Sequence, residues 1–133
     1  MAMSEVAPVT SGEVGGSAEV SALVAAACLL HGLSEPNRLA ILQHLALGEH
    51  RVVDLTDHLG LAQSTVSKHL ACLRDCGLVV SRPSGRASMF SLAHPRATAD
   101  VLRAAERLLE ATGEAVVLSA NFGPAALHAD EDW

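Results

Sequence analysis

Aromatic residues are scarce in this sequence. Its 133 residues include two Phe, one Trp and no Tyr, so aromatics make up 2% of the chain while apolar residues make up 50%. Proteins that bind single-stranded nucleic acid usually stack bases on aromatic rings, and this chain offers almost none. The core must be built from aliphatic side chains, which favours helices packed on helices.

Long apolar runs and an export signal are also missing. No run approaches the roughly 18 apolar residues of a membrane-spanning helix, and no basic region precedes an N-terminal hydrophobic stretch. Three cysteines are an odd number, so reduced thiols are favoured over a disulfide framework. We therefore expect a cytoplasmic protein, with no membrane partner, whose thiols can react or bind a metal ion.

Positive charge is scarce overall but concentrated locally. The chain has 9 Lys and Arg against 15 Asp and Glu, for a net charge of −6. Within residues 62–86, however, the one acidic residue is Asp75, and four residues are basic: Lys68, Arg74, Arg82 and Arg86. A compact basic region between acidic ends indicates that the middle of the chain binds nucleic acid.

The length suits one domain with loose ends. Gly, Pro and Ser interrupt any apolar period over residues 1–17, which predicts a disordered N-terminal arm. We expect the folded domain over residues 18–119 and a flexible acidic tail over residues 120–133.

Three longer segments have helical patterns. The Ala-rich stretch 19–33 is apolar on nearly all sides, which suits a helix buried on more than one face, against a partner chain. Ser34 as N-cap and Pro36 in the first turn predict a second helix to about Leu47. Leu and Val at helical spacing predict a last helix over 97–119. The apolar first and last helices favour a homodimer.

Two shorter helices are predicted between them. The row VVDLTDHLGL predicts a helix that ends at Gly60, and AQSTVSKHLACLRDCG predicts one that ends at Gly77. A turn of three residues between two helices is typical of the helix-turn-helix. In the helix that ends at Gly77, Val66, Leu70 and Leu73 form one apolar stripe, which leaves the opposite side of this helix for DNA.

Strand-like runs at 78–82 and 87–92, separated by Pro-Ser-Gly, predict a β-hairpin. The expected fold class is thus mainly α with a small β-hairpin: a winged helix-turn-helix homodimer that binds double-stranded operator DNA. The candidate DNA-binding residues are polar or basic and lie on the helix that ends at Gly77 or near the hairpin tip: Ser64, Thr65, Ser67, Lys68, His69, Arg82 and Arg86. For His69 a positioning or DNA-contact role is favoured over a part in a metal site with Cys72, three residues later.

The segments SEPNRLAILQHL and DLTDHLGLAQSTVSKHLACLRDCGLVVSRPSGRASMFSLA resemble the ArsR/SmtB family of metal-responsive winged-helix repressors. The resemblance covers about Ala26 to Leu118 and is most specific at STVSKHL, GLV and SRPSGRASMFSL. It implies a homodimer, joined through its first and last helices, that leaves its operator when metal binds. An enzyme with a Cys nucleophile and a His base is disfavoured, because no oxyanion motif accompanies the cysteines.

The resemblance also implies where metal could bind. The family's zinc site on the last helix would fall here on His94, Arg96, Arg107 and Glu110, and two arginines cannot ligate a cation. Cys72 and Cys76, four residues apart, share one helix face. The segment ACLRDCGLVV resembles the cadmium- and lead-sensing, CmtR-like branch, which implies a thiolate site at this pair. The alternative is that both are small buried apolar residues.

That branch takes a third thiolate from the C-terminal tail, where this chain has no Cys. Cys28 is the remaining candidate, with packing in the first helix as its alternative role. Three sulfurs suit Pb(II), As(III) or Hg(II), and a fourth ligand for Cd(II) could come from His31, His128 or Asp130. The expected effector is a thiophilic metal ion, Cd or Pb first, with Zn, Hg and As(III) as alternatives.

A thiol-based redox or sulfur sensor of the same fold is the alternative function. Residues four apart on a helix have Cα atoms about 6 Å apart, near the upper range for a disulfide, so Cys72 and Cys76 could be oxidised together. His44, His50 and His58 are scattered along the sequence, and no function is predicted for them.

Overall fold

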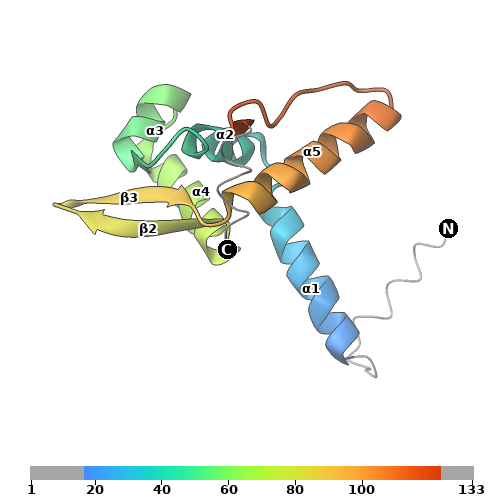
Figure 1. The fold of residues 1–133 in the computed structure, drawn as a ribbon. Coiled ribbons are helices and arrows are strands. Elements are labelled where there is room, and N and C mark those ends of the chain that lie inside the picture. The colour runs from blue at the N-terminus through green and yellow to red at the C-terminus, as the bar shows by residue number, and fades with distance from the viewer. Residues whose placement is uncertain (1–16, 124–133) are drawn as a thin grey trace.

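The computed structural model describes residues 17–123 (Figure 1). Its helices and strands, in chain order, are α1 (Ser17–Gly32), α2 (Pro36–Leu45), β1 (His50–Arg51), α3 (Val52–Leu59), α4 (Gln63–Asp75), β2 (Val79–Ser84), β3 (Ala87–Leu92) and α5 (Pro95–Ala111). The predicted winged helix-turn-helix is confirmed, with α3 and α4 as the helical pair. Most of the predicted arm and tail lies outside the described residues.

Glycines end both helices of the pair, as predicted. Gly60 follows α3 with φ of 68°, and Gly77 follows α4 with φ of 80°, a left-handed conformation that glycine adopts without steric cost. The cap of α2 differs from the prediction. Glu35 rather than Ser34 holds that position, and its carboxylate accepts a hydrogen bond from the Arg38 backbone N–H at 3.0 Å.

The predicted hairpin is present and belongs to a larger sheet. β2 pairs antiparallel with β3, from Val79 opposite Leu92 to Ser84 opposite Ala87. The short strand β1, which was not predicted, pairs with the other side of β3, so the strand order is β1-β3-β2. The hairpin extends from the helical body like a wing (Figure 1). β1 thereby attaches the start of α3 to the base of this wing.

The main core lies between α2, α3, α4 and the sheet. The predicted stripe of α4 is confirmed, since Val66, Leu70 and Leu73 are at most 1% exposed. The other buried members are aliphatic apart from one ring, as the composition requires: Ile41, Leu42, Leu45, Leu55, Leu78, Val79 and Phe90. Burying one such side chain stabilises the fold by roughly 1.5–3 kcal/mol, so the core fixes the orientation of α4.

The last helix is shorter than predicted. It ends at Ala111 rather than at residue 119, because Gly113 adopts φ of 98° and the chain turns back. The Glu106 carboxylate accepts hydrogen bonds from the backbone N–H groups of Leu118 and Ser119 at 2.6 and 2.8 Å. Phe122 is 2% exposed and packs on Ala99 and Leu102, so packed structure reaches past residue 119, where the domain was expected to end.

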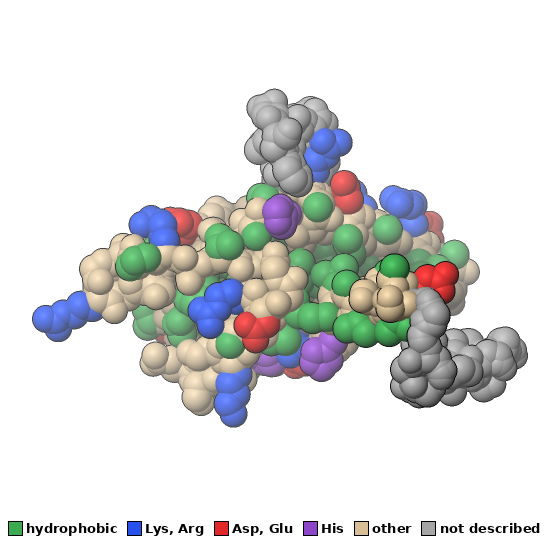
Figure 2. Space-filling view, turned by 90° about the horizontal axis from the view of Figure 1, so that it is seen from below, with side chains coloured by type: hydrophobic (Ala, Val, Ile, Leu, Met, Phe, Trp, Pro, Cys, Tyr) green, Lys and Arg blue, Asp and Glu red, His purple; other side chains and the backbone are tan. Residues whose placement is uncertain are grey.

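The apolar helix α1 projects from the body in Figure 1. The prediction that it is buried on more than one face does not hold within one chain, where Leu23, Val24 and Leu30 are 53–63% exposed. Leu108 on α5 is similarly exposed, at 68%. Figure 2, the view from below Figure 1, shows hydrophobic side chains gathered on the side of the molecule from which α1 projects. In residues 17–123 no single helix is long and apolar enough to cross a membrane, and the apolar pair α1 and α2 is bent by 83°.

Candidate DNA-binding surface and thiol site

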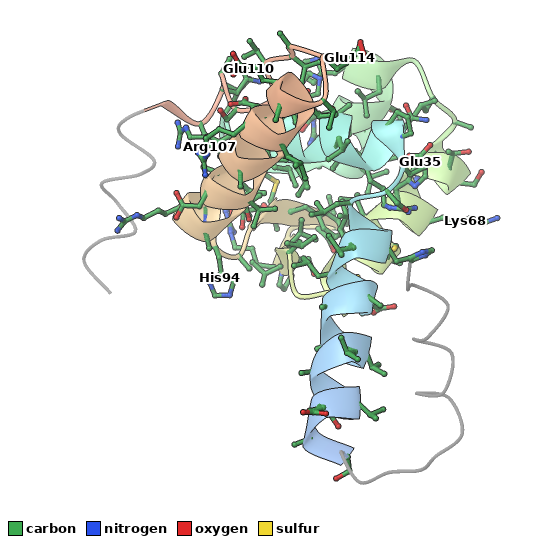
Figure 3. The ribbon with its side chains drawn as sticks, turned by 90° about the vertical axis from the view of Figure 1, so that its right-hand side faces the viewer. Glu35, Lys68, His94, Arg107, Glu110 and Glu114 are labelled. Carbon is green, nitrogen blue, oxygen red and sulfur yellow. The ribbon has the colours of Figure 1, made fainter. Side chains whose placement is uncertain are left out.

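The exposed side of α4 carries the predicted reading residues. Ser64, Ser67 and Lys68 are exposed and Thr65 is half-buried, on the face opposite the apolar stripe. Lys68 points away from the body into solvent (Figure 3). Within residues 17–123 it takes part in no ion pair, so its ammonium group is available for a phosphate or a base edge.

His69 lies on the inner side of this surface. Its side chain is 14% exposed, and its Nε2 lies 3.7 Å from a Glu35 carboxylate oxygen. Its Nδ1 lies 3.4 Å from Nη1 of Arg38. These contacts support a positioning role for His69.

The two arginines of the wing have different surroundings. Arg82 donates two hydrogen bonds to the Glu49 carboxylate, at 2.9 and 2.7 Å, so its charge is already paired. This hydrogen bonding is the main reason why the pKa of Glu49 is lowered. Arg86 follows the hairpin turn at Gly85, is exposed, and forms no ion pair within the described chain. The geometry therefore favours Arg86 over Arg82 as a phosphate contact.

A hollow of about 380 Å³ lies where the wing meets α3 and α4. Arg51, Gln63 and Arg86 line it together with Ser88. Sequence reasoning missed Arg51 and Gln63, because they join Arg86 only when β1 pairs with β3. Arg51 is bound to Asp54 at 3.2 Å, so the hollow presents both a paired and an unpaired guanidinium.

The structure brings two of the three thiols together. The Sγ atoms of Cys28 on α1 and Cys76 at the end of α4 are 3.5 Å apart, although the residues are 48 positions apart in sequence. The Cys76 thiol also donates to the Cys28 carbonyl oxygen at 3.2 Å. Cys72 is half-buried one turn earlier on α4. The cluster thus joins the projecting helix to the recognition helix.

Cys76 holds its proton firmly. Burial raises the pKa of its thiol to about 11, and the neighbouring thiols of Cys28 and Cys72 add to the rise. Cys76 also caps the C-terminal end of α4, where the helix dipole disfavours an anion. Without a bound cation the sulfur is therefore neutral at physiological pH.

Gly32 leaves space beside this thiol. A Cβ at position 32 would lie 3.0 Å from the Cys76 Sγ, closer than nearly all such contacts. Within residues 17–123, no three Cys, His, Asp or Glu side chains are already arranged to hold a metal ion. A site at these thiols therefore needs an adjustment that brings Cys72 to the close Cys28–Cys76 pair.

Arg38 links α1 to the recognition helix. Its guanidinium donates to the carbonyl oxygens of His31 and Gly32 at 2.8 and 2.9 Å, where α1 ends. Its third nitrogen faces His69 on α4. A displacement of the end of α1 is therefore transmitted through a side chain that also contacts α4.

The last helix carries the residues of the family's zinc site in an unsuitable form. Figure 3 shows His94 near the beginning of α5, and Arg107 and Glu110 towards its other end. Arg96 and Arg107 stand at two of the four positions, and a guanidinium has no lone pair for a cation. The absence of such a site on α5 stays a prediction.

The family model described as "Bacterial regulatory protein, arsR family" matches residues 35–81. A probable mercury resistance operon repressor from Streptomyces lividans is 41% identical over 64 residues, which are 48% of this chain and 51% of the relative. The transcriptional regulator CmtR of Mycobacterium tuberculosis is 46% identical over 69 residues, covering 52% and 58%. The chain thus spans little more than half the length of these relatives, which are regulators and not enzymes.

Among solved structures, the fold matches the homodimeric winged helix-turn-helix DNA-binding domain Mb0332 from Mycobacterium bovis. The TM-score is 0.65 and the identity 27%, over 80% of this chain and all of the other. The matched family segment runs from the start of α2 into β2 and contains the whole helix-turn-helix. On this sequence match and fold, the chain belongs to the arsR family of bacterial regulatory proteins.

Proposed function

We propose that the protein is a dimeric transcriptional repressor that releases its operator when a thiophilic metal ion binds Cys28, Cys72 and Cys76. The observation that carries this proposal is the 3.5 Å separation of the Cys28 and Cys76 sulfurs. Two sulfurs bound to one tetrahedral ion at about 2.3 Å lie about 3.8 Å apart. The pair is therefore close to ligand spacing before any ion binds.

The three sulfurs supply a soft donor set. Thiolates select ions such as Cd(II), Pb(II), Hg(II), Zn(II) or As(III) over Mg²⁺ and Ca²⁺. Cadmium and lead remain our first choices. The relatives named for mercury and arsenical resistance operons support a thiophilic effector of this broader group. Each thiol must lose its proton on binding, so affinity should rise steeply with pH.

The same contacts suggest how binding reaches DNA. Drawing Cys28 and Cys72 towards Cys76 moves the end of α1 relative to α4, and Arg38 joins these two helices. Release requires that metal binds the low-affinity conformation more tightly than the DNA-bound one. The thiol cluster meets this requirement if its three sulfurs converge only in the released conformation.

The dimer is part of the proposal. An apolar hollow of about 400 Å³ lies between α1 and α5, lined by Leu29, Leu33, Leu78 and Val101. Together with the exposed leucines of both helices it forms a surface that a second copy would cover. The homodimeric relative of M. bovis supports this arrangement.

The decisive experiment titrates reduced protein with Cd(II), Pb(II), Zn(II), Hg(II) and As(III). Ultraviolet thiolate charge-transfer absorption reports binding, and fluorescence anisotropy reports release from a labelled duplex that the protein has selected from a random library. We expect Cys72→Ser and Cys76→Ser to keep DNA affinity and to lose metal-driven release. Cys28→Ser should remove about one third of the thiolate absorption.

Lys68→Ala is the matched control, because it should weaken DNA binding while metal stoichiometry stays unchanged. If Cys76→Ser still dissociates normally when metal is added, the thiol site is wrong. If metal binds all three thiols without releasing DNA, the coupling is wrong.

Redox sensing is the second candidate, and the structure adds Cys28 to its possible partners. The Cys28 and Cys76 sulfurs are 3.5 Å apart, so this pair could be oxidised as well as Cys72 with Cys76. Bond formation requires contraction to about 2.05 Å. Hydrogen peroxide would accept the two electrons, so that two thiols and one hydrogen peroxide yield one disulfide and two waters. The raised pKa of Cys76 disfavours the reactive thiolate, which ranks this function second. Release by peroxide, reversed by a reductant without any metal, would favour it.

A further inference from the structure

We propose that His44, His50 and His58 form a second metal site, free of thiols, for a divalent ion that prefers imidazole, such as Zn²⁺ or Ni²⁺. The three residues are separated in sequence but meet in the fold. His44 lies in the last turn of α2, His50 in β1, and His58 in the last turn of α3. This proposal does not depend on the thiol site.

The rings form one compact cluster. The centroids of His44 and His58 are 5.0 Å apart, those of His50 and His58 are 5.5 Å apart, and those of His44 and His50 are 6.3 Å apart. Three imidazoles that share one tetrahedral ion, with metal–nitrogen bonds of 2.0–2.1 Å, have centroids about 5.2 Å apart. The His44–His58 and His50–His58 spacings lie close to this value, and the His44–His50 spacing of 6.3 Å is the one that must shorten.

His50 has a defined ligand nitrogen. Its Nδ1 lies 2.7 Å from the Gly48 carbonyl oxygen, which can only accept a hydrogen bond, so Nδ1 carries the proton. In the neutral ring the other nitrogen, Nε2, then offers its lone pair to a metal ion. A backbone carbonyl that orients an imidazole in this way is a common partner of metal-binding histidines.

The surroundings favour neutral rings and a bound cation. Burial lowers the pKa of His44, and the neighbouring His58 and His50 lower it further. His44 and His58 lie at the C-terminal ends of two helices, where the dipoles attract positive charge. Two of the acidic groups near the cluster are already engaged, Glu49 by Arg82 and Asp54 by Arg51. Water or a small anion would therefore complete the coordination.

The rings need one rearrangement. His44 and His58 are nearly parallel, with an interplanar angle of 6°, so their nitrogens do not yet converge. The part of the chain that the structure describes accordingly has no ready-made metal centre. His58 is exposed and can turn without disturbing the core. Binding would then fasten α2 and α3 to β1, at the base of the wing.

The test uses protein in which all three cysteines are replaced by serine, so that only imidazoles remain as strong ligands. We expect calorimetric titration with Ni²⁺ or Zn²⁺ to show saturable binding of a single ion per chain, with a raised melting temperature. His44→Gln, His50→Gln and His58→Gln should each weaken binding by at least about tenfold, since loss of even an outer-shell partner costs that much. His31→Gln, an exposed histidine on α1, is the matched control and should change nothing.

If the thiol-free protein does not fold, Co²⁺ in the wild-type protein replaces this test. The imidazole site gives ligand-field bands without sulfur charge transfer, and His58→Gln should remove those bands alone. Absence of saturable binding, or binding that none of the three variants weakens, overturns the proposal.

Discussion

Replacing Cys28 and Cys72 by serine leaves Cys76 as the chain's one thiol, and its reaction with an aromatic disulfide reagent measures how firmly the fold retains the sulfur's proton. Burial is the largest single cause of its raised pKa, so a rise should survive the loss of the two neighbours. The wild-type pKa of about 11 is the upper limit for the variant. At this limit about 0.1% of the sulfur is thiolate near pH 8, against about 24% for an ordinary thiol of pKa about 8.5.

The rate difference is smaller than this ratio. A more basic thiolate is also more nucleophilic, and a Brønsted slope of about 0.4–0.5 returns a factor of roughly 10–18. Cys76 should therefore react roughly 20-fold more slowly than an ordinary thiol, before any steric protection. In denaturant the same variant should react at the ordinary rate.

The matched comparison is the chain that keeps only Cys28, which is exposed. Reaction is followed by release of the coloured thiol, with mass spectrometry to confirm the modified residue. If folded Cys76 reacts within about twofold of Cys28, far less than the roughly 20-fold expected, the argument from burial is refuted.

Three further predictions concern DNA binding, assembly and stability. Lys68→Ala and Arg86→Ala should each lower the slope of log affinity against log salt by about 0.9, measured by anisotropy, and unchanged slopes would contradict the proposed surface. Leu23→Gln with Leu108→Gln should give monomers or insoluble protein, because both exposed side chains lie on the proposed dimer surface, and an unaltered dimer in sedimentation would disprove this. Phe122→Ala should lower the free energy of unfolding by about 3–5 kcal/mol in denaturant titration, since the ring is buried, whereas a change near zero would show that residues 118–123 add nothing to the fold.

The sequence alone was sufficient for the helix-turn-helix and the wing, because their signals are local. The α4 stripe of Val66, Leu70 and Leu73 follows from helical periodicity, and Gly60 and Gly77 mark where helices end. The spacing of Cys72 and Cys76 likewise follows from one helix turn. The predicted length of α5 was wrong because the apolar pattern continues past Ala111. The structure shows that the residues after the helix instead turn back and bind Glu106.

Only the tertiary structure decided which distant residues meet. The Cys28–Cys76 contact depends on the angle at which α1 leaves the body, and the histidine cluster depends on β1 pairing with β3. Neither contact produces a periodic pattern of residues in the sequence. Contacts between elements arise from packing of the whole core and not from the spacing within one element. The sequence therefore determined which chemical groups are present on each element, and the packing of those elements determined which groups can act together.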